Sequence, residues 1–360
     1  YNRVLPNDID MTLTFLKSKE EEALYRIVDT GYPLIGDEPT VPTEKAPDGR
    51  PIYNQTGKYG YRAGLYNVCC GDREVFTASL SKAFRDGDTF VTLAYTAQDH
   101  QNRSDMTSAT SNSNFGKTGA IDFNNRIKNR STYETEHSLL MTLTSKHYFF
   151  GSNAPTTFSL VFSRESGNVK YPTFDTYTSW PGDYKSKAFG YEFNLNDDSS
   201  SLLYIPTVND PLVCYSYKCL SEGSAEAAER QEEVINFLYN VWGLKDYAGK
   251  IAPRDAGNFP WQSSLDLNIV QEIPGFREGD SFVLTFALEN LLNFIDDDKG
   301  IIRYGYYSGR VPVIDLRIVD NERYDYSRNA FRYSFDDPFN IDRSTTQSLW
   351  RASLGIQYKF

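Results

Sequence analysis

This sequence of 360 residues contains no long apolar run. No window approaches the roughly 18 consecutive apolar residues that a membrane-spanning helix needs. Any membrane span would therefore have to be built from strands, whose backbone groups are satisfied in a closed sheet. Hydrophobic residues make up 40% of the chain, which is enough for a folded protein. A helical membrane protein is excluded, while a soluble all-β protein and a β-barrel both stay open.

Residues that bind metals or act as nucleophiles are also scarce. The chain has three histidines, and His137 and His147 lie ten residues apart on one expected strand, too far apart to share an ion. No serine–histidine–aspartate or cysteine–histidine arrangement stands out. The run Asp296-Asp297-Asp298 lacks the spaced oxygen ligands of a calcium loop, so a solvated acidic turn is the better interpretation. We expect no cofactor, no metal site and no enzymatic activity.

The four cysteines fall as an adjacent pair, Cys69 with Cys70, and as Cys214 with Cys219. Neither spacing is typical of zinc. Because the features below indicate export into an oxidising compartment, we expect a disulfide between Cys214 and Cys219. The role of Cys69 and Cys70 stays open.

Acidic residues outnumber basic residues in this chain. The net charge of −11 gives no basic face for phosphates and argues against nucleic acid as a partner. The sequence opens at Tyr1 with neither an initiator methionine nor a signal peptide, so we expect a processed or truncated piece of an exported protein.

Aromatic residues are abundant at 15%, and period-two alternation dominates the chain. At the end, Trp350, Leu354 and Phe360 belong to an apolar series that alternates with a polar series. The same alternation predicts a strand at 9–15 and three hairpins, whose turns lie at 85–88, 151–155 and 274–280. The Asp86-Gly87 pair suits a two-residue turn with positive φ.

Short turns alternate with long polar connections at 19–72, 99–131, 164–260 and 293–347. Connections of this length count against a soluble domain, whereas outer-membrane barrels combine short periplasmic turns with long extracellular loops. Within them, 224–242 has helical spacing and is expected to pack on neighbouring loops, and 311–319 is expected to form loop strands. An even number of spans, most simply zero, is expected between the strand at Phe282 and the last strand.

Three features indicate that the apolar series faces lipid rather than a second packed sheet. The polar series consists mainly of Ser, Thr, Asn, Gln and Gly, as in a barrel lumen. The chain ends on an alternating strand with a terminal Phe, so we expect Tyr358 and Phe360 to form a signal for the barrel-assembly machinery. Aromatic residues gather at the ends of the expected strands, as in interfacial girdles: Phe84, Tyr95, Phe149, Phe158, Trp261, Trp350 and Tyr358.

The penultimate expected strand ends in Asn290-Leu291-Leu292-Asn293 and the last strand in Tyr358-Lys359-Phe360. With these strand ends the sequence resembles TonB-dependent outer-membrane receptors, and over almost its whole length it is similar to their Oar-like branch. The family's penultimate strand ends in an Asn-Leu-Phe-like motif and its last strand in aromatic-Lys-Phe. Further Oar-like landmarks match, although Arg254-Asp255 stands where that branch has Arg-Asn. The matching segments are Asn290-Leu291-Leu292-Asn293, Tyr358-Lys359-Phe360, Asp48-Gly49-Arg50 with Tyr53, Ser166-Gly167, Leu202-Leu203-Tyr204-Ile205-Pro206, Arg254 before Pro260-Trp261, Leu265-Asp266-Leu267 and Gln271-Glu272-Ile273-Pro274-Gly275.

The resemblance implies a plug domain, a TonB-contacting segment and a barrel of 22 strands; neither the plug nor the TonB segment is recognisable here. We therefore expect residues 1–360 to be the C-terminal part of the barrel, all-β and antiparallel, about eight strands with long extracellular loops and one short loop helix. By resemblance, the complete receptor moves a scarce substrate across the Gram-negative outer membrane with TonB-supplied energy, and its partners are outer-membrane lipid and the remainder of the same receptor. The alternative is a self-contained eight-stranded barrel that binds surfaces or mediates adhesion.

Two sets of residues are candidates for binding. The alternation predicts that one set points into the lumen, toward a plug or substrate, although mutual hydrogen bonding along the wall would suit the same residues. The other set is a group of loop tyrosines suited to stacking on a ligand, and loop packing is the competing interpretation. The lumen set is Asp266, Asn268, Glu289, Arg351 and Gln357, and the loop set is Tyr304, Tyr306, Tyr307, Tyr324 and Tyr326.

Overall fold

The computed structural model describes residues 1–21, 23–29, 44–52, 62–103, 109, 118–122, 125–175, 201–216, 223–304, 310–316, 331–334, 342–343 and 345–360. Among them, no helix is both long enough and apolar enough to cross a membrane.

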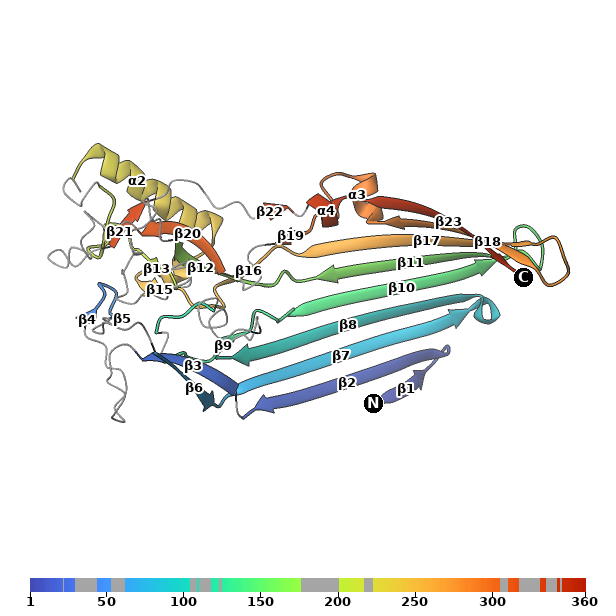
Figure 1. Ribbon diagram of the computed structural model, residues 1–360, viewed down its shortest axis with the longest axis horizontal. Helices are drawn as coiled ribbons and strands as arrows, with labels where there is room; N and C mark the ends of the chain where they lie inside the picture. The colour runs from blue at the N-terminus through green and yellow to red at the C-terminus, as the bar shows by residue number, and fades with distance from the viewer. Residues whose placement is uncertain are drawn as a thin grey trace.

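One large antiparallel sheet dominates the molecule. It contains eight long strands in sequence order, preceded at its edge by the short β1 (Asn2–Leu5), and all of them lie side by side in Figure 1. The eight are β2 (Ile9–Glu20), β7 (Gly71–Phe84), β8 (Thr89–Asn102), β10 (His137–His147), β11 (Thr156–Glu165), β17 (Gln262–Pro274), β18 (Ser281–Glu289) and β23 (Arg351–Lys359). β9 (Asn129–Arg130) pairs only with β8.

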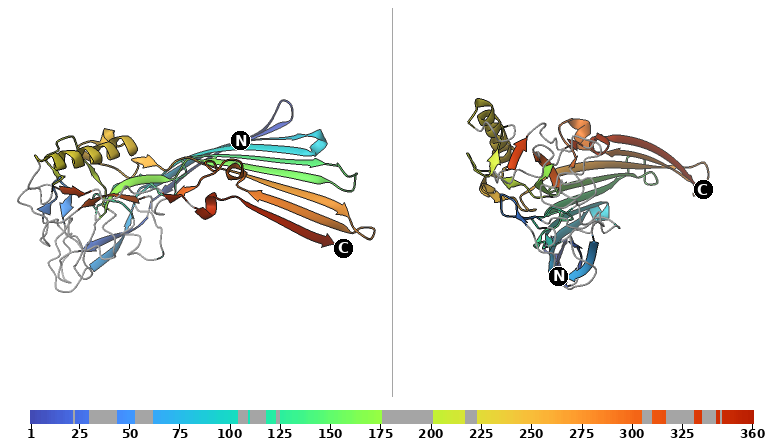
Figure 2. Two further views of the ribbon diagram at one scale, coloured as in Figure 1. Left: turned by 90° about the horizontal axis from the view of Figure 1, so that it is seen from above. Right: turned by 60° about the vertical axis from the view of Figure 1, so that its left-hand side comes forward.

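The sheet does not close on itself. β1 and β23 stand at opposite ends of the strand order, and Figure 2 shows the two chain ends on opposite edges of a curved, open sheet. Since residues 1–360 are expected to be part of a larger barrel, the strands at 9–15 and at the C-terminus should lie apart, each without an outer partner. They do lie apart, but one detail was wrong, because β2 pairs with β1 on its outer side.

Tight turns join the strands at one end. The three residues Pro6, Asn7 and Asp8 connect β1 to β2, and Asn7 and Asp8 both have the positive φ that tight hairpin connections use. The turn predicted at 85–88 is confirmed, because Phe84 pairs with Thr89 across this four-residue connection. Positive φ extends beyond the Asp86-Gly87 pair to Arg85.

The other end of the sheet carries a second unit, the loop module, made from the long connections (Figure 1). Its five-stranded sheet runs β14 (Val213–Cys214), β21 (Phe331–Ser334), β20 (Arg310–Leu316), β12 (Val169–Asp175) and β16 (Gly257–Asn258). Because β12 and β20 come from different connections and pair in parallel, the two longest loops are interlocked.

Smaller elements complete the structure. Two-stranded pieces are β3 (Ala23–Asp29) with β6 (Arg62–Val68), β4 (Glu44–Lys45) with β5 (Pro51–Ile52), β13 (Tyr204–Ile205) with β15 (Lys250–Ile251), and β19 (Arg303–Tyr304) with β22 (Asp342–Arg343). Short helical turns are η1 (Arg85–Gly87), η5 (Lys245–Tyr247), α3 (Leu291–Ile295) and α4 (Thr345–Ser348).

The expected loop helix is present as α2 (Ala225–Asn236), continued by the π-turn η4 (Phe237–Val241). The Ser224 hydroxyl accepts a hydrogen bond from the Ala227 N–H, which caps the helix at its start. Val234 and Leu238 are buried in the main hydrophobic core, so the helix packs on the other loops as expected. Val241 was expected on the packed face, but the switch to π-turn geometry leaves it exposed.

Buried arginines tie the module together and to the sheet. Arg50 donates to the Asp48 carboxylate at 2.8 Å and to the Leu202 carbonyl at 2.8 Å. Arg254, 2% exposed, donates to the carbonyl of Asn102 at the end of β8. Because a buried guanidinium must be hydrogen-bonded, these contacts fix how the loops sit. Arg50 and Arg254, which belong to the segments that resemble the family, therefore have structural roles.

Candidate functional site: a two-faced sheet with aromatic borders

The strand registers place the alternating apolar residues on one continuous face, the apolar face. Successive direct partners form a row across six strands: Met11, Leu80, Leu93, Met141, Phe162 and Leu265. Leu288 and Ala352 extend the neighbouring row that passes through Leu267. Since one slipped register would turn a whole strand over, the agreement of all the pairings defines the face.

No second layer of described residues covers the apolar face, although Leu288, close to α3, is buried. Leu354 and Ile356 are 75% and 71% exposed, and Phe15, Leu80, Leu93 and Phe286 are also exposed. The hydrophobic core lies in the loop module, and in the long strands the buried apolar side chains are Val283 and Leu288. Monomeric soluble proteins rarely expose a continuous apolar surface of this extent, so this face requires an apolar environment.

The opposite face, the polar face, carries hydroxyls and charges. Thr77 and Thr96 are hydrogen-bonded at 3.1 Å, and Ser163 and Ser264 at 2.9 Å. The registers place all five expected lumen residues on this face: Asp266, Asn268, Glu289, Arg351 and Gln357.

Two of those residues form an ion pair. Glu289 and Arg351 are direct cross-strand partners, with carboxylate and guanidinium 2.9 Å apart. Asp266 accepts a hydrogen bond from the Asn290 N–H at 2.8 Å, while the Oδ1 atom of Asn268 is buried without a partner among the described residues. Part of the set is thus bonded along the wall, as the competing interpretation anticipated.

An aromatic row borders the apolar face near the loop module. The Tyr95 hydroxyl and His137 Nδ1 are 2.8 Å apart, and the His137 ring stacks at 6.0 Å on both Tyr95 and Trp261. The guanidinium of Arg164 lies 5.5 Å above the Trp261 ring. Further along, Phe294 meets Trp350 edge to face at 5.1 Å.

A second aromatic row borders the turn end of the sheet. His147 stacks on Phe149 at 5.2 Å and meets Phe158 edge to face at 5.8 Å. On the last hairpin, the Phe282 and Tyr358 rings are 4.7 Å apart, and the Tyr358 hydroxyl donates to the Asp280 carboxylate. Phe276 and Phe360 extend this group.

The separation of the two rows is set by the strands. His137 and His147 are the first and last residues of β10 and point to the same side. Their ten residue steps correspond to roughly 33 Å along the strand, and to about 25 Å vertically at the tilt of about 40° usual in membrane barrels. From the sequence, these histidines were considered only as metal ligands. Their positions at both ends of an apolar alternation were the signal that they belong to the borders.

The loop candidates are less fully described. Tyr304 lies in β19, whereas Tyr306, Tyr307, Tyr324 and Tyr326 are outside the described residues. Cys214 is disulfide-bonded, and its expected partner Cys219 is also outside them.

The acidic run 296–298 forms a turn of its own. Asp296 accepts a hydrogen bond from the Asp298 N–H at 3.0 Å and pairs with Lys299 at 3.1 Å, and both contacts lower the pKa of Asp296. These contacts fit the acidic turn favoured by the sequence.

Comparisons with protein-family models, with curated proteins and with solved structures found no match to this chain.

Proposed function

We propose that this chain forms part of the barrel wall of a TonB-dependent outer-membrane receptor, which moves a scarce substrate across the outer membrane with energy supplied through TonB. The observation that carries the proposal is the exposed apolar face bordered by two aromatic rows. At the strand tilt of about 40° usual in membrane barrels, their separation of roughly 33 Å along the strand becomes about 25 Å, which matches the height of the apolar band on such barrels. Phospholipid and lipopolysaccharide chains would cover this face, and the polar face would line the interior.

The open edges support a wall segment over a self-contained barrel. β23 lacks a strand on its outer side among the described residues, and β1 stands at the opposite edge. Backbone N–H and C=O groups left unpaired in lipid each cost several kcal/mol, so the edges must pair with further strands. The resemblance to a 22-strand family supplies such strands from the rest of the same polypeptide.

In the assembled receptor, the loop module would lie outside the cell above the wall. Its interlocked strands and buried arginines would hold the binding loops in fixed positions, and the carboxylates, amides and guanidinium of the polar face would meet the plug or the substrate. The transported substrate would be captured by the loops before it reaches the interior.

Photo-cross-linking from β23 tests the assignment of the edges. A photoreactive residue would replace Leu354, close to the free edge, in the protein assembled in its native outer membrane, with cross-linked peptides identified by mass spectrometry. We expect cross-links to peptides that lie outside residues 1–360. Cross-links to β1 or β2 instead would establish a closed eight-stranded barrel and support the adhesion alternative.

A further inference from the structure

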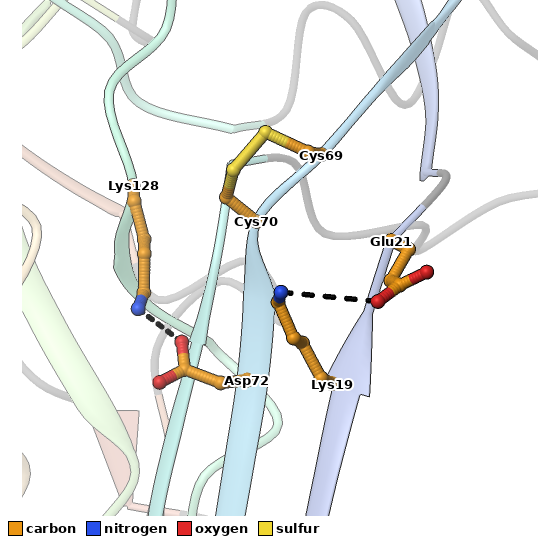
Figure 3. Close-up of a disulfide and its surroundings, with 6 residues drawn as sticks. All are labelled: Lys19, Glu21, Cys69, Cys70, Asp72 and Lys128. Atoms are coloured by element: carbon orange, nitrogen blue, oxygen red, sulfur yellow. Dashed lines mark ion pairs between the residues drawn. A yellow bond between two sulfur atoms is a disulfide. The ribbon is translucent and has the colours of Figure 1, made fainter.

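Cys69 and Cys70 are joined to each other by a disulfide, at the point where β6 passes into β7 (Figure 3). The hairpin β3–β6, here called the arm, lies on one side of this point. The wall hairpin β2–β7 lies on the other. Cys69 is exposed, so reagents in solution reach the pair.

The arm and the wall hairpin share one register. Glu20 pairs with Gly71 at the end of the wall hairpin, and Ala23 pairs with Val68 at the start of the arm. Two residues separate the paired positions on each strand, so both sets of pairs fit a single uninterrupted antiparallel ladder. Glu21, Cys69 and Cys70 nevertheless lie outside the strands, and the structure divides the ladder into two separate sheets.

The break coincides with the disulfide. Cys70 has a φ of 93°, whereas residues in an antiparallel ladder have strongly negative φ. A disulfide between neighbouring residues closes a small ring that includes their peptide bond, so the ring restricts the backbone of both cysteines. The Cys70 N–H is held by the Glu20 carbonyl at 3.0 Å, out of step with the regular pairing.

We propose that Cys69 and Cys70 form a thiol-exchange site whose oxidation state decides whether the arm is continuous with the wall hairpin. The co-reactant is a dithiol. One of its thiolates attacks a sulfur of the pair, so that the Cys69–Cys70 bond breaks and a mixed disulfide forms. The second thiolate of the dithiol then attacks the dithiol's own sulfur in this mixed disulfide and releases the cysteine. Two electrons and two protons pass to the cysteines, and the dithiol leaves as its disulfide.

The surroundings favour a co-reactant selected by sulfur chemistry rather than by charge. Lys19 pairs with Glu21 at 3.8 Å, and Lys128 pairs with Asp72, so two ion pairs flank the disulfide (Figure 3). Each ammonium group is offset by a carboxylate. After reduction, Cys70 is free to take the extended backbone, and a pair between Glu21 and Cys70 extends the ladder toward the arm.

Hydrogen exchange measured by mass spectrometry on the protein in detergent or membranes tests the proposal. The experiment uses a Cys214→Ser, Cys219→Ser background, so that dithiothreitol acts only on Cys69 and Cys70. We expect reduction to slow amide exchange in 20–23 and 68–71 by about tenfold, the effect of one or two added backbone hydrogen bonds. Peptides from β10 and β11 are the internal control and should not change.

A Cys69→Ser, Cys70→Ser variant of the same background should exchange slowly in 20–23 without reductant and should not respond to it. The proposal is overturned if exchange is unchanged or faster after alkylation has shown the pair to be reduced. It is also overturned if both thiols are alkylated in protein that was never reduced, because the disulfide would then be absent.

Discussion

Phe286 and Leu354 are directly opposed across β18 and β23, and both side chains are exposed, Phe286 at 37% and Leu354 at 75%. A cross-strand apolar pair in a soluble sheet would be covered by a second layer. Here the pair belongs to a face that crosses all eight long strands with no covering element among the described residues. The pair therefore represents the whole apolar face, and it provides the sharpest test of the proposal that this face meets lipid.

Substitution of Leu354 by lysine should be strongly destabilising. The side chain lies midway between the aromatic rows, and a lysine near the bilayer midplane costs roughly 2–4 kcal/mol. We expect a large loss of assembled protein in outer membranes and lower heat stability. Ser353→Lys is the matched control, because the neighbouring residue lies on the polar face and its lysine would stay in water. Equal yield and heat stability of the two variants would contradict the assigned facing.

Asn290 should be essential for holding the connection that follows β18. Its backbone is left-handed, with a φ of 52°, and its side-chain amide donates to the Gly300 carbonyl at 2.9 Å and the Ser348 carbonyl at 2.7 Å. Loss of both bonds in Asn290→Ala leaves buried carbonyls unpaired, at a cost of about 2–3 kcal/mol. We expect faster proteolytic cleavage within 291–347 in intact membranes.

Asn290→Gly separates the side-chain effect from the backbone effect. Glycine adopts the positive φ freely but lacks the amide donors. It should be cleaved faster than the wild type and more slowly than Asn290→Ala. Wild-type resistance in the glycine variant would show that the hydrogen bonds contribute nothing.

Alkaline pH should loosen the loop module before it affects the sheet. Burial raises the pKa of Tyr204, Tyr239 and Tyr247, and for Tyr204 the hydrogen bond to Asp210 adds to this. The folded module keeps these protons when the unfolded chain loses them near the ordinary tyrosine pKa of 10.0. The stabilisation is thus full below pH 10.0 and is lost as pH rises toward the higher folded pKa values.

Proteolysis of the module across this pH range measures the effect. Cleavage should accelerate above about pH 10, and Tyr204→Phe, which has no proton to lose, should show a smaller acceleration. Lys170 acts in the opposite direction, because burial lowers its pKa and removal of its proton favours the folded state. If Tyr204→Phe and the wild type show the same pH dependence, Tyr204 does not contribute as described.

The long strands were predictable because each is specified locally. Period two, as in 350–360, fixes which residues share a face, and Gly and Asp mark the turns. β1 was missed because four residues carry too little alternation, although Asn7-Asp8 is a turn signal in its own right. The register across neighbours, which makes Met11 and Leu265 part of one row, follows from the same alternation once the turn lengths are fixed.

The loop module was not predictable in the same way. The parallel pairing of β12 with β20 joins residues more than a hundred positions apart, and neither strand shows which partner it selects. The end of the β2–β7 ladder likewise coincides with a disulfide between Cys69 and Cys70 that spacing alone does not reveal. The helix at 224–242 was found because the helical spacing of its apolar residues and its stop, Gly243, are local signals.

The most direct test of the central claim is the behaviour of the protein toward detergent. The protein would be separated from cell membranes and then analysed by size-exclusion chromatography with light scattering, with and without detergent. Because the apolar face has no covering layer, we predict that the protein fractionates with outer membranes, requires detergent for extraction and aggregates when detergent is removed. Recovery of a monodisperse monomer without detergent would contradict the claim that the apolar face meets lipid.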